Sequence, residues 1–137
     1  MALPDLASCI TMTQAHPPAS YSIGTVNSSG IDCRGMYSAV IIFSNGTVGG
    51  GETVDVTIET SSDDGSGDAY TAVTGAAFTQ ATGARDDVTY TGRLILTNAE
   101  RYIRVVGVTA GGAVIWGCNV ILFPEDTRLA DTIDWQV

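Results

Sequence analysis

The chain alternates hydrophobic and polar residues in several short stretches, most regularly over residues 53–60. Val54, Val56 and Ile58 fall on one side of an extended chain, and the polar residues between them fall on the other. A period of two is typical of a β-strand that is buried on one face and solvated on the other. Residues 61–68 are all Ser, Asp or Gly, so they predict a loop directly after this strand.

A second type of stretch is apolar almost without interruption. Residues 36–43 end in Val-Ile-Ile-Phe, which predicts a strand near the centre of a sheet. Residues 113–123 form the last strong strand, which Pro124 ends. Weaker alternation predicts further short strands, at residues 21–26, 70–74, 77–79, 88–96 and 101–108.

These stretches predict the fold class. We count about eight strands, separated by turn residues at the spacing typical of sandwiches, and no segment shows a convincing helical period. The expected fold is all-β, a single antiparallel β-sandwich or jelly roll of about eight strands with extended terminal arms. Asn45-Gly46 is expected to form a tight hairpin turn, and Gly111-Gly112 a hairpin loop.

The length of 137 residues predicts one folded domain with an arm at each end. Residues 20–123 are expected to form the β-sandwich domain. Residues 1–19 contain three of the four prolines and are expected to form an extended N-terminal arm. Residues 124–137 are acidic and are expected to form a C-terminal arm. Neither a signal peptide nor a membrane-spanning segment is expected.

The charge balance narrows the class of partner. Fifteen Asp and Glu residues face six Arg and no Lys, so the formal net charge is −9. Binding to nucleic acid or to anionic lipid depends on cationic side chains, so we expect neither nucleic acid nor membrane as a partner. Only 15% of the residues are charged, which favours a surface that is partly covered by other protein.

The residues that most enzymes need are scarce. His16 is the only histidine, which rules out a His-based triad or a multi-His metal site within one chain. Cys9, Cys33 and Cys118 lack metal-ligand spacing, and we interpret them as small buried hydrophobic residues. A pairing of Cys33 with Cys118 stays open. No enzymatic activity, metal or cofactor is expected.

The acidic loop at 61–68 superficially resembles a calcium-binding loop. Its acids, Asp63, Asp64 and Asp68, do not alternate as in an EF-hand, and no Glu follows at the required distance. We interpret it as a solvated turn in which Asp side chains cap backbone amides, and leave calcium or glycan binding open. A pair of glycosidase carboxylates has candidates here and at 86–87, but nothing fixes two of them at the required separation.

The two tryptophans predict different roles. Trp116 lies within an apolar strand and is expected in the core. Trp135 lies in the acidic arm with no strand around it, and an isolated aromatic residue of this kind is typical of an anchor in a partner's pocket. Ile133 and Val137 are expected beside it, and Arg128 is expected to pair with a carboxylate across the contact.

Three segments resemble the small decoration (cement) proteins of tailed bacteriophages. Residues 56–65 (VTIETSSDDG) combine a strand with a Ser-Asp-Asp-Gly turn, residues 70–75 (YTAVTG) follow as a second strand, and residues 101–105 (RYIRV) form a later one. The resemblance spans residues 36–123 and provides no catalytic residues. The proline-bearing N-terminal segment and the Trp-bearing C-terminal segment have no counterpart in it.

The resemblance implies a non-enzymatic virion protein. It would be made in the host cytoplasm, bind the outer surface of the expanded head and clamp neighbouring major capsid proteins together. It would also associate with itself as a homodimer or homotrimer, with arms exchanged between neighbours. Two alternatives stay open, another virion β-module from a tail or spike, and a carbohydrate-binding or adhesin-like sandwich.

Overall fold

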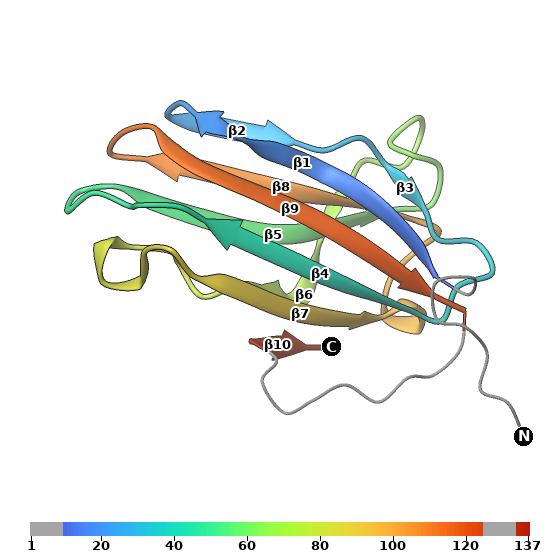
Figure 1. Ribbon diagram of the computed structural model, residues 1–137. Helices are drawn as coiled ribbons and strands as arrows, with labels where there is room; N and C mark the ends of the chain where they lie inside the picture. Colours follow the sequence, from blue (N-terminus) through green and yellow to red (C-terminus); the bar gives the residue numbers. More distant parts are fainter. Residues whose placement is uncertain (1–9, 125–133) are drawn as a thin grey trace, which may run out of the picture.

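A computed structural model describes residues 10–124 and 134–137. Ten strands and two single-turn 3-10 helices make up the described chain (Figure 1). The strands are β1 (Thr11–Tyr21), β2 (Gly24–Asn27), β3 (Ile31–Asp32), β4 (Ser38–Asn45), β5 (Thr53–Ser61), β6 (Thr71–Ala77), β7 (Thr89–Ile95), β8 (Tyr102–Ala110), β9 (Val114–Phe123) and β10 (Trp135–Gln136); the helices are η1 (Gly83–Arg85) and η2 (Leu96–Asn98).

The strands form two sheets that pack face to face. The first, sheet A, has the order β1-β9-β4-β7-β10, and the second, sheet B, has the order β2-β8-β5-β6, with β3 also paired to β8. All pairs are antiparallel except β10 with β7. Without the two-residue strands β3 and β10, eight strands remain in the order of a jelly roll. The predicted fold class is confirmed.

The core lies between the sheets and follows the predicted alternation. Val54, Val56 and Ile58 of β5 are almost completely buried. Trp116 of β9 reaches across the core to sheet B, where a Cβ atom at Gly107 would overlap its indole ring. Its Nε1–H donates to Thr109 Oγ1 at 3.2 Å, so the buried indole is fully satisfied. The expected core position of Trp116 is confirmed.

The predicted connections are partly wrong. β4 is central in sheet A, between β9 and β7, as its apolar run predicts. However, β4 and β5 lie in different sheets, and so do β8 and β9. Residues 46–52 and 111–113 therefore cross between the sheets and close no hairpin. Asn-Gly and Gly-Gly pairs specify a chain reversal, but they do not specify which sheet the next strand joins.

Both terminal segments contribute strands to sheet A. Residues 11–19, predicted as part of an arm, belong to β1, which pairs along β9, so the predicted boundary at residue 20 falls inside a strand. Pro17 and Pro18 are accommodated because β1 is an edge strand, where the register shifts between His16 and Ala19. Among the described residues, no helix is long and apolar enough to cross a membrane.

Candidate interaction surface

The outer face of sheet A carries a row of apolar side chains. The register places Met12, Ile121 and Val40 opposite one another across β1, β9 and β4, with the charged Arg93 of β7 at the end of the row. Val40 and Arg93 are both buried, at 5% and 7% exposure. On β9, β4 and β7 the residues next to this row along the strand belong to the core, so the side chains of the row point away from it, and Met12 on β1 is itself 62% exposed. Ile42, two residues after Val40 on β4, extends the apolar row along the same face.

This face is also free of acidic residues. None of the five strands of sheet A contains Asp or Glu, and Arg93 is their one Arg or Lys residue. Yet the protein as a whole carries fifteen acids. Those in the described residues lie in sheet B or in loops and strand ends. Among residues 10–124 and 134–137, the strands of sheet A thus provide a surface on which another protein can approach without facing strand carboxylates.

Two apolar side chains of sheet A are strongly exposed. Met12 on β1 is 62% exposed, and Ile115 on β9 is 57% exposed. Beside Ile115 lies an open hollow of about 220 Å³ with Pro18, Ser44 and Gly117 in its lining. At Gly117 the backbone of Pro18 approaches closely, because an added Cβ atom would lie 3.1 Å from it. An exposed apolar residue beside an apolar hollow is the arrangement that protein interfaces use for anchoring contacts.

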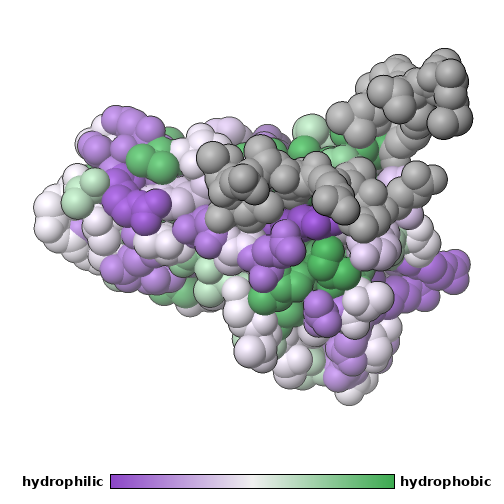
Figure 2. Space-filling view, turned by 90° about the horizontal axis from the view of Figure 1, so that it is seen from below, coloured by the Kyte–Doolittle hydropathy of each residue, from purple (hydrophilic) through white to green (hydrophobic). Residues whose placement is uncertain are grey.

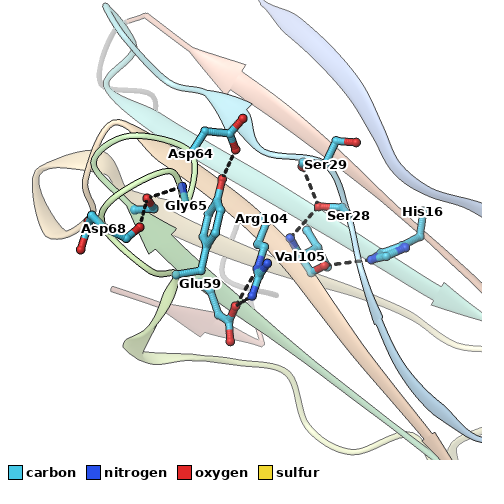
Figure 3. A network of polar contacts seen from close by, with 11 residues as sticks. His16, Ser28, Ser29, Glu59, Asp64, Gly65, Asp68, Arg104 and Val105 are labelled. Atoms are coloured by element: carbon cyan, nitrogen blue, oxygen red, sulfur yellow. Dashed lines mark hydrogen bonds and ion pairs between the residues drawn. The ribbon is translucent and has the colours of Figure 1, made fainter.

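The outer face of sheet B has the opposite character. Glu59 of β5 and Arg104 of β8 form an ion pair at 2.6 Å (Figure 3). The Arg104 guanidinium stacks over the Tyr70 ring at 4.3 Å, and the Tyr70 hydroxyl donates to Asp64 at 2.6 Å. Burial and this hydrogen bond raise the pKa of Tyr70 above its ordinary value. The polar groups of this face are thus paired with one another.

Further pairs of the same kind surround that network. Asp55 accepts a hydrogen bond from Gln80 at 2.8 Å. Asp32 on β3 accepts two hydrogen bonds from Arg101, which hold the pKa of its carboxyl at about 2. Val108 is the exposed large apolar residue of this sheet, and it is 38% exposed. The face is that of an ordinary solvated sheet.

The acidic loop at 61–68 satisfies its own backbone. Asp63 accepts hydrogen bonds from the amides of Gly67 and Asp68, at 2.6 and 3.0 Å, and Asp68 accepts one from the Ser62 amide at 2.8 Å. These bonds lower the pKa of both carboxyls. The interpretation of Asp side chains that cap backbone amides is confirmed. Residues 10–124 and 134–137 contain no group of three or more His, Cys, Asp or Glu side chains that could hold a metal ion.

The other candidates for chemistry are buried. His16 lies on β1, and its Nε2–H donates to the Val105 carbonyl of β8 at 2.9 Å (Figure 3). Burial lowers the pKa of His16, partly opposed by this bond. Cys33 and Cys118 are buried free thiols whose pKa values burial raises to about 12, so they are not activated as nucleophiles. Cys9 lies outside the described residues.

Of the four residues predicted to bind a partner, the structure describes two. Trp135 on β10 and Val137 pack against this chain's own core, and Trp135 is only 8% exposed. Arg128 and Ile133 lie outside the described residues. A role of these four in binding a second molecule stays a prediction.

Sequence reasoning missed the surface on sheet A. A signal for it was present, because β4 and β9 contain the longest apolar runs, which predict burial on both faces. In a two-layer sandwich only one face of each sheet meets the other sheet. Part of this second face is already covered within the chain, since Val40 is only 5% exposed, and the face is open at Met12 and Ile115.

Comparisons with known proteins add evidence on the fold. No protein-family model matches this sequence, and a search of curated proteins finds no significant relative. Among solved structures, the PBSX exported protein XepA matches with a TM-score of 0.59 at 13% identity, over 93% of this chain and 42% of that chain. The infectious bursal disease virus Gx strain structure matches with a TM-score of 0.53 at 13% identity, over 91% and 34%.

A third structure, the infectious bursal disease virus VP2 subviral particle, matches with a TM-score of 0.52 at 16% identity, over 82% of this chain and 31% of that chain. The present chain thus spans less than half the length of each of these three structures. At these identities the similarity shows a common fold.

Proposed function

We propose that this protein is a non-enzymatic virion structural protein that decorates the expanded head of a tailed bacteriophage. It binds the outer surface of the head and cements neighbouring major capsid proteins. Three observations support the proposal: the resemblance of residues 36–123 to decoration proteins, the fold shared with viral particle structures and XepA, and the outer face of sheet A. The outer face of sheet A is the observation on which the proposal mainly rests.

In this proposal sheet A faces the shell. Met12 and Ile115 are available for contact, and the hollow beside Ile115 accepts an apolar side chain of the capsid protein. Burying an apolar surface contributes roughly 25 cal/mol per Å², whereas burying unpaired carboxylates opposes binding. Sheet B, whose charges already pair within the chain, faces solvent.

The protein would stabilise the expanded head because it binds that state preferentially. A protein that binds the expanded shell more tightly than its precursor shifts the equilibrium toward the expanded shell. A homodimer or homotrimer that contacts several capsid proteins gains further from effective concentration, so each contact can be modest. The net charge of −9 suits the outer surface and disfavours the side that holds packed DNA.

The test is binding to heads in two states. Labelled protein is incubated with expanded heads and with unexpanded precursor heads of the phage that encodes it, and binding is measured by co-sedimentation. We expect saturable binding to expanded heads and at least tenfold weaker binding to precursors. Equal binding to both, or label found by electron microscopy on tails alone, would overturn the proposal; the second result would favour a tail component.

A further inference from the structure

Residues 134–137 fill a groove at the edge of the sandwich between β6 and β7. β10 pairs in parallel with β7, with Trp135 opposite Gly92. A Cβ atom at Gly92 would overlap the Trp135 indole, and one at Gly75 of β6 would lie 2.7 Å from Val137 Cγ1. Both glycines thus leave room for these two side chains. Figure 2 looks at this edge and shows an apolar patch bordered by hydrophilic side chains.

The groove holds the segment through its main chain and through one acidic side chain. The Asp134 amide donates to Thr91 O at 2.7 Å, and Val137 exchanges hydrogen bonds with the backbone of Arg93 and Ile95 at 3.1 and 2.6 Å. The Asp134 carboxylate accepts from the Thr79 amide and hydroxyl, both at 2.8 Å. This is the geometry of a bound peptide that adds a strand to a sheet edge.

The pocket around Trp135 fits the shape of its indole ring, but the indole N–H makes no hydrogen bond. Its ring meets Phe78 edge-on at 5.4 Å. However, its buried Nε1–H has no hydrogen-bond partner, whereas Trp116 donates to Thr109. A buried donor without a hydrogen-bond partner costs free energy, so it weakens the binding of Trp135 in this pocket. Together with a strand of only two residues, this makes β10 far easier to detach than the central strands.

The chain between the two described segments is longer than the groove requires. Sheet A places β9 three strand positions from β10, which is about 14 Å across the sheet at the usual spacing. The end of β9 is level with Ile95 and Trp135 with Gly92, about 10 Å along the strands, so the two offsets combine to about 17 Å. The nine residues 125–133 span up to about 30 Å when extended. This surplus lets the same segment reach the same groove in an adjacent copy. Exchange of identical elements in this way is a low-cost route to an oligomer.

We propose that the groove between β6 and β7 is a peptide-binding site for the Asp-Trp-Gln-Val segment, and that a second copy of this chain supplies the segment in the self-associated protein. Trp135 and Val137 are the anchoring side chains, and Gly92 and Gly75 form the floor. The inference does not depend on binding to heads, because it concerns the purified protein alone.

Disulfide trapping of Thr79 and Asp134 tests the proposal, because their side chains touch and both residues are exposed. Full-length protein carrying Thr79→Cys is mixed with full-length protein carrying Asp134→Cys, both with Cys9→Ser. The mixture is oxidised mildly and analysed by non-reducing electrophoresis. A double variant with both substitutions in one chain is oxidised alongside. We expect a covalent heterodimer from the mixture and covalent oligomers from the double variant.

Two further substitutions control for chance collisions. Gly92→Ala in the Thr79→Cys copy blocks the groove, and Trp135→Ala in the Asp134→Cys copy removes the anchor. Each should lower the heterodimer yield at least tenfold. A monomeric intrachain disulfide in the double variant with no heterodimer would overturn the proposal, since the segment would then stay in its own chain. Absence of any disulfide in either sample would overturn it as well, because the groove would then hold no such segment.

Discussion

The outer faces of sheets A and B have the same architecture and opposite chemistry. On sheet A, Val40, Ile42 and Ile121 lie side by side, and none of the strands carries an acid. On sheet B, Glu59 pairs with Arg104, and Asp55 accepts from Gln80. A sandwich needs one apolar face per sheet for its own core. Sheet B meets that need, and its outer face is mainly polar apart from Val106 and Val108, whereas the outer face of sheet A is mainly apolar along β4 and β9.

In the proposed function, this difference indicates which face meets the partner. Folding alone explains the alternating pattern of β5, but not the continuous apolar runs of β4 and β9. An extra apolar face is an aggregation hazard in a free monomer and is retained where another protein covers it. The contrast between the faces can be tested by changing each one separately.

The largest effect is expected from acidic substitutions on sheet A. Met12→Asp and Ile115→Asp place a carboxylate at exposed positions of the proposed contact. Burying an unpaired charge against the shell costs at least about 2 kcal/mol, which corresponds to an affinity loss of at least about 30-fold. Binding of each variant to expanded heads by co-sedimentation measures the loss.

Val108→Asp is the matched control for these two variants. Val108 is the exposed large apolar residue of sheet B, and its substitution should change affinity for heads less than twofold. If Val108→Asp weakens binding as much as Ile115→Asp, the contrast between the faces has no functional meaning. Melting temperatures of all three variants establish that each is folded.

A smaller effect is expected from pH at the edge of sheet A. The pKa of His16 is lower in the folded protein than the ordinary 6.5, so the unfolded chain binds a proton first as pH falls. Stability should therefore be unaffected at pH 8 and should decrease as pH falls below about 6.5, with a slope of at most about 1.4 kcal/mol per pH unit. Urea unfolding at several pH values measures this.

His16→Gln keeps a donor for the Val105 carbonyl but removes the titration. Its stability should lack that part of the pH dependence. Hydrogen exchange should show that acid loosens β1 in the parent protein before it loosens β6, because the His16 bond ties β1 to β8. If the free energy of unfolding of His16→Gln depends on pH as strongly as that of the parent protein, His16 is not the cause of the pH dependence.

A still smaller effect is expected on sheet B. Glu59→Gln removes the charge that pairs with Arg104, and both side chains are about a quarter exposed. Ion pairs of this kind contribute about 0.2–1 kcal/mol. Thermal unfolding should show a loss in that range, and affinity for heads should stay unchanged. A clear loss of head binding would place this face in the contact.

The smallest effect on stability is expected at the exposed Asp32–Arg101 pair. Arg101 lowers the pKa of Asp32 to about 2, so the stabilisation that the pair provides is present above pH 3.8 and is lost as pH falls toward 2. In Arg101→Gln the pKa of Asp32 should rise toward 3.8. A side-chain carboxyl titration by nuclear magnetic resonance detects the change, and an unchanged midpoint would show that Arg101 is not the cause.

Much of the fold follows from local sequence pattern. The alternation of β5 identifies its buried side chains, and the apolar run of β4 identifies a central strand. Strand pairing does not follow, because β4 and β5 are consecutive in the chain but lie in different sheets. The sequence predicts residues 1–19 as an extended arm but does not predict their pairing with β9, because it indicates only that helix at His16 is disfavoured by Pro17 and Pro18. They are tolerated here at an edge, where a missing N–H leaves no ladder bond unmade.

The candidate site was predictable only in part. The sequence predicts that Trp135 anchors in a partner's pocket, whereas the structure shows it packed against Gly92 and Phe78 of its own chain. This packing depends on residues more than forty positions away, which no local pattern reveals. The apolar face of sheet A depends in the same way on the register of four strands. The sequence of a single strand indicates which of its own residues lie on that face, but not which residues of the other strands lie beside them.

Oxidative footprinting of the protein on intact expanded heads tests the central claim most directly. Hydroxyl radicals modify exposed side chains, so their reactivity before and after binding reports which face is covered. The account predicts that Met12 and Ile115 lose most of their reactivity on binding, while Val108 and Tyr70 keep theirs. Protection of Val108 and Tyr70 with Met12 and Ile115 still reactive would contradict it.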